Sequence, residues 1–214
     1  MADKVEHTPR DMTLTADDRD AAADLLTESF FDNPAHTFIY PDPKTRHERL
    51  RWLMYANLGA QLAIGQSFAE RDEDGAIAAM AFWHAPGAPE ASSAELARFG
   101  FLDMAVLHGT AAFERMIQSV AELERRRAYG LAGRESWYLN NMVVAPAWRG
   151  AGVGSRLLRR QLETVVNPSG HPASLTTQRP ENVTFYERLG FVVTDSRPVS
   201  LGPASFPNWI MVYR

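Results

Sequence analysis

The spacing of apolar residues along the chain changes repeatedly between the period of a helix and the short runs of a strand. Over residues 16–31 apolar side chains recur every three or four positions, after a Thr15 and Asp18 pair typical of a helix start. Asn33-Pro34 is expected to end this helix. A longer helix is expected after Pro41-Asp42-Pro43, because an apolar face continues from Leu50 to Leu62.

Short apolar runs between turn residues predict the strands. They are expected at residues 12–14, 66–70, 76–85, 136–144, 171–178, 191–195 and 208–213. Further helices are expected over two stretches of residues 91–131 broken near His108-Gly109-Thr110, over residues 152–166, and from Pro180 to Gly190. The apolar stripe of the second stretch is expected to comprise Phe113, Met116, Ile117, Val120 and Leu123.

This order of elements predicts an α/β fold with a central mixed sheet flanked by helices. The 214 residues, 45% of them hydrophobic, suffice for one sizeable core and are short for two. We therefore expect a single domain over residues 11–214, with a helical insertion at about residues 91–131 and a flexible tail over residues 1–10.

Composition narrows the classes of function. The net charge of −4 argues against general nucleic-acid binding and favours a cationic substrate through long-range attraction. The chain contains no cysteine, which excludes disulfides, thiolate metal sites and an acyl-cysteine intermediate. His7, His47, His108 and His171 have no ligand-like spacing with carboxylates, so no metal site is expected. Without a signal sequence or a run that could span a bilayer, we expect a cytoplasmic protein with no membrane partner.

The most informative stretch of the chain is Arg149-Gly150-Ala151-Gly152-Val153-Gly154. It joins an apolar run to an amphipathic helix, and its glycines leave backbone N–H groups open to close approach by a ligand. Partial positive charge at the start of the helix adds to this, so the turn suits a pyrophosphate. It lacks the lysine of a nucleotide-triphosphate loop and is too short for a dinucleotide fingerprint. On its own it is equally compatible with a tight connection.

A second segment narrows the interpretation of this turn. It follows just over two dozen residues later and contains Asn182, Tyr186, Gly190 and Phe191 in the pattern Asn-x-x-x-Tyr-x-x-x-Gly-Phe. Together with Arg149, Gly152 and Gly154 of the turn, this segment resembles the GCN5-related N-acetyltransferase (GNAT) family, over about residues 136–195. The resemblance implies a sheet that splays open between the family's fourth and fifth strands, here residues 136–144 and 171–178.

The resemblance also implies acetyl-CoA as the cofactor, with its pantetheine arm in that gap. The implied cofactor-binding residues are Met142, Val143, Val144, Arg149, Gly150, Ala151, Gly152, Val153, Gly154, Ser155, Asn182 and Tyr186. The loop amides would hold the pyrophosphate, and Arg149 and Ser155 would add hydrogen bonds. A bulge in the strand before the loop would direct the Met142 or Val143 amide at the thioester carbonyl as the oxyanion donor.

Catalytic roles follow from the same resemblance. Tyr186 is expected to protonate the departing coenzyme sulfur, with plain aromatic packing as the alternative. Many family members have a glutamate base on the strand before the loop, where this chain has Asn140 and Asn141, which cannot act as bases. The remaining candidates for the base are Glu135, His84 and Glu28, and a water relay without a dedicated base is a further alternative.

The acceptor is indicated only by a weaker similarity. Phe30-Phe31-Asp32-Asn33-Pro34, Tyr40-Pro41-Asp42 and Trp137-Tyr138-Leu139 are similar to the antibiotic-acetylating, puromycin N-acetyltransferase-like branch of the family. This implies transfer of acetyl directly to a primary amine of a small molecule. A protein or peptide amine and a non-catalytic acetyl-CoA sensor are the alternatives, and both a monomer and a homodimer fit the sequence. Six aromatic residues are expected to pack in the core, with an apolar acceptor pocket as the alternative: Phe31, Phe38, Tyr40, Trp52, Phe82 and Trp83.

Overall fold

The computed structural model describes residues 13–88 and 93–214. The strands are β1 (Gln66–Arg71), β2 (Ile77–His84), β3 (Trp137–Val144), β4 (Ala173–Thr177), β5 (Val192–Asp195), β6 (Val199–Leu201), β7 (Ala204–Phe206) and β8 (Trp209–Tyr213). The α-helices are α1 (Arg19–Phe30), α2 (Pro34–Ile39), α3 (Pro43–Ile64), α4 (Ser93–Arg98), α5 (Met104–His108), α6 (Thr110–Gly130), α7 (Val153–Gln161), α8 (Asn167–Ser169) and α9 (Pro180–Glu187). A π turn, η4 (Leu162–Val166), continues α7, and 3-10 turns form η1 (Ala16–Asp18), η2 (Phe101–Asp103) and η3 (Pro146–Trp148).

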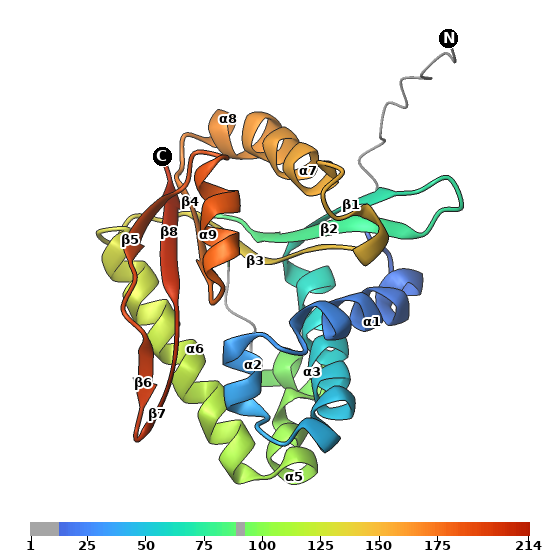
Figure 1. The fold of residues 1–214 in the computed structure, drawn as a ribbon, viewed down its shortest axis with the longest axis vertical. Coiled ribbons are helices and arrows are strands. Elements are labelled where there is room, and N and C mark those ends of the chain that lie inside the picture. Colours follow the sequence, from blue (N-terminus) through green and yellow to red (C-terminus); the bar gives the residue numbers. More distant parts are fainter. Residues whose placement is uncertain (1–12, 89–92) are drawn as a thin grey trace.

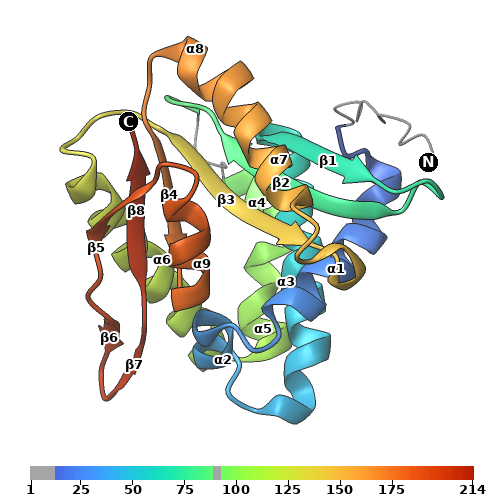
Figure 2. The ribbon, with the colours of Figure 1, turned by 45° about the horizontal axis from the view of Figure 1, so that its top comes forward.

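A mixed sheet organises these elements. Its six strands lie in the order β1-β2-β3-β4-β8-β5, with helices against both faces (Figures 1 and 2). Neighbouring strands are antiparallel except β3 and β4, which run parallel. The mixed sheet between two helical layers confirms the predicted fold class.

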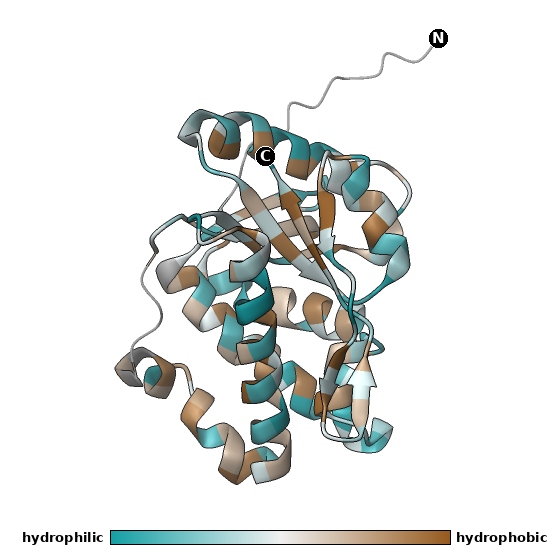
Figure 3. Cartoon of the chain, turned by 90° about the vertical axis from the view of Figure 1, so that its left-hand side faces the viewer, coloured by the Kyte–Doolittle hydropathy of each residue, from teal (hydrophilic) through white to brown (hydrophobic). Residues whose placement is uncertain are grey.

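The sheet separates two hydrophobic cores. Met80 and Phe82 of β2 pack toward α1, α3 and α5, whereas Ala79, Ala81 and Trp83 pack toward α7 and α9. Since both faces of β2 are covered, its sequence is a continuous apolar run rather than an alternating one. The central strands accordingly appear largely brown in Figure 3, while the surrounding helices mix teal and brown.

A β-bulge reverses the alternation of side chains along β3. Phe82 is paired with Asn141 and Trp83 with Leu139, which leaves Asn140 as the extra residue. Leu139 before the bulge and Met142 after it therefore face the same core, beside α7 and α9, although they are three positions apart. A bulge on this strand was expected near Met142 and Val143, but it lies at Asn140.

The two parallel strands stay together for only three residue pairs. Trp137–Leu139 pairs with Ala173–Leu175, and beyond these residues β3 remains paired with β2 while β4 remains paired with β8. The sheet thus opens at Asn140 on one side and Thr176 on the other. The splay predicted between residues 136–144 and 171–178 is confirmed, and the bulge lies where the strands part.

Three local expectations need correction. Residues 13 and 14 form no strand, and Met12 and the predicted tail at residues 1–10 lie outside the described residues. Asn33-Pro34 ends α1 as expected, but it also starts α2, because the Asn33 side chain accepts a hydrogen bond from the Ala35 amide at 3.0 Å. The β6–β7 hairpin was not predicted, and it packs against α6 and α2.

The insertion between β2 and β3 is helical in its described residues, as predicted, and Gly109 with φ of +88° separates α5 from α6. The buried face of α6 was predicted only in part. Met116 is buried, but Ile117 and Val120 are about half exposed, at 48% and 53%. Ser119 and Arg126 are buried instead, because their side chains find hydrogen-bond partners inside the protein.

Candidate active site

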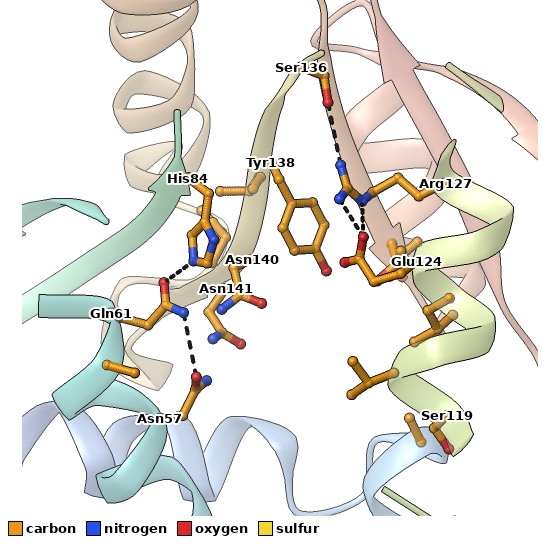
Figure 4. A pocket seen from close by; sticks show the side chains of 18 of the residues that line it. Asn57, Gln61, His84, Ser119, Glu124, Arg127, Ser136, Tyr138, Asn140 and Asn141 are labelled. Atoms are coloured by element: carbon orange, nitrogen blue, oxygen red, sulfur yellow. Dashed lines mark hydrogen bonds and ion pairs between the residues drawn. The ribbon is translucent and has the colours of Figure 1, made fainter. Parts of the chain in front are cut away.

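A cavity of about 820 Å³ opens beside the splayed strands. Its walls come from both sides of the gap, with Asn140, Asn141 and Met142 on β3, Thr176 and Thr177 on β4, and Asn182 and Tyr186 on α9. The opposite walls come from α2, α3 and α6 (Figure 4). The cavity therefore joins the opening in the sheet to the helical insertion.

The glycines of the loop between β3 and α7 have two different structural roles. Gly150 and Gly152 have φ of +79° and +76°, a conformation that other residues adopt at a cost. Gly154 instead allows close packing, because a Cβ at this position would lie 2.6 Å from Met142 Cε and 2.8 Å from Val144 Cγ2. The start of α7 can therefore rest directly on β3, next to the gap.

This packing leaves a row of main-chain donors at the start of α7. Arg149 and Ala151 use their N–H groups within the turn, donating to Pro146 and Trp148 carbonyls at 3.3 and 3.4 Å. The N–H groups of residues 153–155 have no partner among the described residues, as expected for the first turn of a helix. These three amides are therefore open to a ligand, as the prediction for this loop requires.

The arginines around the loop bind protein groups. The Arg149 side chain donates to the Val144 carbonyl at 3.2 Å and to Ser29 on α1 at 3.4 Å. Arg156 and Arg160 lie 3.7 Å from the buried carboxylate of Glu70 on β1. Arg156 also donates to the Ala151 carbonyl at 3.0 Å, so it braces the loop from the side of α7.

The direction of the β3 amides follows from the ladder with β2. Ala145 donates to the Ala78 carbonyl at 2.9 Å, and alternate residues of a strand point their N–H groups to opposite edges. Val143 therefore directs its N–H at β2, whereas Met142 and Val144 direct theirs at the gap. Of the two amides considered for the oxyanion, the one that faces the gap is Met142.

Tyr186 and Asn182 both line the cavity from α9, as their spacing predicts. Tyr186 is 8% exposed and packs between Phe185 and Phe191, with ring centroids 5.1 and 5.8 Å away. Burial, with a smaller contribution from Tyr138, raises the pKa of Tyr186, so its phenol stays protonated at neutral pH. Asn182 donates to Thr177 Oγ1 at 3.1 Å and so ties α9 to the end of β4, rather than capping the helix.

His84 lies at the end of β2 inside the cavity. Its Nε2 donates to Gln61 Oε1 at 2.8 Å, and Gln61 Nε2 in turn lies 3.5 Å from Asn57 Oδ1 (Figure 4). Nδ1 of His84 has no hydrogen-bond partner among the described residues, so it keeps a lone pair. Burial lowers the pKa of His84, which Glu124 raises and Arg127 lowers to smaller extents. The ring is therefore neutral at pH 7.

The two carboxylates proposed as bases lie elsewhere. Glu28 does not line the cavity, and its carboxylate is bound 3.0 Å from Nε2 of His47 on the outer surface of α1 and α3. This position removes Glu28 from the candidates, because a base must reach the reacting amine. Glu135 does line the cavity, but it is an exposed residue at its rim, next to Gly87.

The structure adds residues that the sequence did not single out. Tyr138 of β3 projects into the cavity, between the His84 ring at 6.0 Å and the Arg127 guanidinium at 4.4 Å from its ring centroid (Figure 4). Glu124 and Arg127 of α6 form an ion pair beside it. The alternative of an aromatic acceptor pocket is wrong, because none of its six residues lines the cavity: Phe31, Phe38, Tyr40, Trp52, Phe82 and Trp83.

His36 of α2 lines the cavity without a partner for Nδ1 among the described residues. Burial lowers the pKa of His36 to about 4, so this ring is neutral as well. In residues 13–88 and 93–214 no three His, Asp or Glu side chains gather to hold a metal ion. The helices of this part of the chain include none long and apolar enough to cross a membrane.

Comparison with known proteins finds similarity in the region around the gap. The family model described as the acetyltransferase (GNAT) domain matches residues 114–193, which include β3, the loop, α7, β4 and α9. A Corynebacterium glutamicum structure described as histone acetyltransferase HPA2 and related acetyltransferase is 23% identical, with a TM-score of 0.67 over 95% of this chain and 94% of that one. Arylalkylamine N-acetyltransferase 2 from Aedes aegypti is 14% identical, with a TM-score of 0.63 over 96% and 98%.

A third similar structure contains the coenzyme. The phosphinothricin acetyltransferase from Sinorhizobium meliloti in complex with AcCoA is 13% identical, with a TM-score of 0.51 over 96% of this chain and 87% of that one. At these identities the three structures establish the shared fold. The matched domain model, rather than these structures, indicates an enzyme. Residues 114–193 of the chain match the acetyltransferase (GNAT) domain, and the protein is an acyltransferase.

Proposed function

We propose that the protein transfers acetyl from acetyl-CoA directly to a primary amine of a small molecule, such as an antibiotic or another amine metabolite. The observation that carries this proposal is the cavity of about 820 Å³, which leads from the helical insertion to the opening between β3 and β4. An acceptor inside it would meet the thioester from the side opposite α7. Drug-sized ligands occupy pockets of roughly 300–1,000 Å³.

In this proposal the coenzyme is held mainly by backbone. The amides of residues 153–155 bind the pyrophosphate at the start of α7, where the helix dipole favours negative charge. Met142 and Val144 direct N–H groups into the gap, where the pantetheine amides would pair with them. The Met142 amide, next to the bulge at Asn140, is the donor proposed for the oxyanion.

His84 is the base that we propose. Its neutral ring has a free lone pair on Nδ1, and Gln61 fixes the tautomer by accepting from Nε2. An amine that is protonated in water must lose a proton before it can attack the thioester carbonyl. His84 takes this proton directly or through one water, the new N–C bond forms, and the C–S bond breaks.

Tyr186 is the proposed acid. Burial raises the pKa of Tyr186 and disfavours a bare thiolate at the same place, so the pKa values of the phenol and of the coenzyme thiol rise together. The phenol is protonated at neutral pH and is able to donate to the departing sulfur. The proton of Tyr186 passes to the departing sulfur. After the N–C bond forms, the nitrogen loses a second proton, which restores the phenol through solvent, and His84 releases the first proton to water. No covalent acyl-enzyme is formed, since the chain has no cysteine to carry one in this scheme.

The depth of the cavity supports a small acceptor more than a peptide. Proteins with similar folds include enzymes named for small amines, such as agmatine N-acetyltransferase with a TM-score of 0.59 and phosphinothricin acetyltransferase, although the Corynebacterium structure is described as a histone acetyltransferase. In this chain α3 and α6 stand on opposite sides of the cavity, and Asn57 and Ser119 line it from these two sides (Figure 4). An extended peptide needs an open groove instead.

A thiol-release assay tests the proposal. Purified protein is given acetyl-CoA and four acceptor classes: aminonucleosides, mono- and diamines, amino acids, and short peptides with a free N-terminus or lysine. We expect coenzyme A release with at least one small amine and little with peptides, and mass spectrometry should find the acetyl group on nitrogen. Release with peptides alone would refute the small-molecule acceptor.

A further inference from the structure

Glu124 brings a carboxylate oxygen into the cavity that no protein group uses. Its Oε2 accepts both hydrogen bonds from Arg127, through Nε at 3.2 Å and through NH2. Its Oε1 has no partner in the described part of the chain, and the side chain is 46% exposed, toward the cavity that it lines. Figure 4 shows the carboxylate of Glu124 facing the hydroxyl end of Tyr138.

Arg127 holds Glu124 in place rather than offering a second binding group. Its Nε and NH2 donate to Glu124, and its NH1 lies 3.4 Å from the hydroxyl oxygens of Ser136 and Ser174. Its guanidinium also lies 4.4 Å from the centroid of the Tyr138 ring. Because each terminal group of Arg127 is occupied, a ligand carboxylate would have to displace an existing contact, whereas a cation would meet a free oxygen.

The groups around this oxygen fit an ammonium ion. Tyr138 presents the polar end of an aromatic ring, and His84 on its far side is neutral because burial lowers its pKa. The remaining charged residues of the cavity wall are the exposed pair Arg134 and Glu135 at the rim. Inside the cavity, the exposed negative oxygen of Glu124 is therefore the main electrostatic feature available to a ligand.

The rest of the cavity wall determines which non-ammonium part of a ligand fits. Side chains from α3, η2 and α6 give an apolar lining, with Leu53, Met54, Phe101, Met116 and Leu123. A ligand that buries apolar area there gains about 25 cal/mol per Å², while a charged or heavily hydroxylated body gains little. An apolar body with one cationic end fits this wall.

We propose that Glu124 is the specificity-determining residue that binds the ammonium group of the acceptor, and that the acceptors are primary amines with an apolar body and no carboxylate beside the amine. This inference rests on the proposed function, of which it names the substrate class. The amine arrives protonated, pairs with Oε1 of Glu124 beside Tyr138, and then gives its proton to His84 on the other side of Tyr138. The neutral amine leaves the carboxylate and attacks the thioester.

Three probes of similar shape test whether binding depends on the ammonium group of the ligand. Phenethylamine has the apolar body and the cation, phenylalanine adds a carboxylate beside the amine, and 2-phenylethanol lacks the charge. Isothermal titration without coenzyme should show binding of phenethylamine and at least tenfold weaker binding of the other two. Equal binding of phenethylamine and phenylalanine, or no binding of phenethylamine, would overturn the proposal.

Variants assign the effect to one side chain. Glu124→Gln keeps the shape and should weaken phenethylamine binding at least tenfold, while Glu124→Asp keeps the charge and should recover part of it. Glu114→Gln is the matched control, because it removes the same charge from an exposed position of α6 outside the cavity. Equal weakening in the control would mean that only net charge matters, and unchanged binding in Glu124→Gln would refute the assignment.

Kinetics separate this inference from the proposed function. If phenethylamine binds but no amine is acetylated, the proposed function fails while the ammonium site stands. If amines are acetylated and Glu124→Gln leaves KM for phenethylamine unchanged, the site assignment fails while the proposed function stands. We expect Glu124→Gln to raise KM for the amine at least tenfold and to leave the acetyl-CoA affinity unchanged, because Glu124 lies on α6, away from the loop that begins α7.

Discussion

The coenzyme side and the acceptor side of this cavity are built in different ways. On the coenzyme side, β3, the glycine loop, α7 and α9 follow one another within residues 137–187, and the groups proposed to act are mostly backbone amides. On the acceptor side, Gln61, His84 and Glu124 come from three elements far apart in the sequence and act through their side chains. Backbone sites depend on local glycines and turns, whereas side-chain sites depend on how helices are rotated against the sheet.

The difference explains why a family motif identifies one side only. A loop that must present N–H groups restricts its sequence to glycine at fixed positions. A carboxylate at the acceptor wall can come from any helix that reaches the cavity. The two sides should therefore respond differently to substitution, and the following changes test this from the largest expected effect to the smallest.

Tyr186→Phe should cause the largest loss, because it removes the only proton donor proposed for the sulfur. General acids contribute about 10²–10⁴-fold to rate, so kcat should fall by at least about a hundredfold. The packing of this ring against Phe185 and Phe191 does not involve the hydroxyl, so acetyl-CoA affinity should stay nearly unchanged. Steady-state kinetics and coenzyme titration measure the two quantities.

The two measurements must differ for the acid role to hold. A parallel loss of coenzyme affinity would mean that Tyr186 supports binding, and an unchanged kcat would leave it as packing alone. Phe185→Leu is a suitable comparison, since it alters the adjacent ring without touching the phenol.

His84→Gln tests the acceptor side and should have a smaller effect. A glutamine can still hydrogen-bond Gln61, but it cannot take a proton, so kcat/KM should fall toward the lower end of the roughly 10²–10⁴-fold range for a base that water partly replaces. The wild type should lose activity only as pH falls well below 6.5, since burial lowers the pKa of His84 from that value. In the variant this acidic limb should disappear, and its persistence would point to another base.

Much of the fold is predictable because each element carries its own signal. The apolar run of β2, the stripe of α7 and the glycine at 109 are visible in the sequence. The bulge at Asn140 is not, since two consecutive asparagines have no apolar member to mark the change of face. Asn33-Pro34 marks the end of one helix in the sequence, and the same pair is also a good start for the next one.

The site is predictable where residues act locally. The motif gives the loop and Tyr186, but not which β3 amide faces the gap, because this depends on pairing with β2. Glu124 lies in a run of charged residues in which Glu122 binds Arg125 and Arg126 outside the cavity. Only the rotation of α6, which is set by packing, determines which of these two glutamates faces the cavity.

Gly154→Val tests the close contact that supports the coenzyme side. The new side chain would overlap Met142 and Val144, so α7 must move away from β3. Overpacking typically costs about 1–3 kcal/mol, and domains of this size lose roughly 2–4 °C in Tm per kcal/mol. We expect a lower Tm by calorimetry and a smaller stabilisation by acetyl-CoA, because the first-turn amides move with the helix.

Arg159→Val is the control for this substitution. It places the same side chain at an exposed position of α7, where it changes helix propensity and removes one exposed charge but creates no close contact with β3. If both variants lose the same stability, the contact of Gly154 with β3 is not what holds α7. If Gly154→Val loses stability but keeps full coenzyme stabilisation, the amides at residues 153–155 are not the phosphate site.

Gln61→Glu should have the smallest effect, and it tests whether the residue at position 61 controls the pKa of His84. The new carboxylate would lie where Gln61 Oε1 now accepts from His84 at 2.8 Å. An opposite charge at this distance favours the protonated ring and should raise the pKa of His84 by about one unit or more. Because only the neutral ring can accept a proton, the acidic limb of kcat/KM should move to higher pH by the same amount. At pH values below both the old and the new pKa, activity should therefore fall about tenfold for a one-unit shift, while activity at pH 8 stays close to that of the wild type. An unshifted limb would mean that the group titrating in the profile is not in contact with Gln61, and the base would have to be sought elsewhere on the cavity wall.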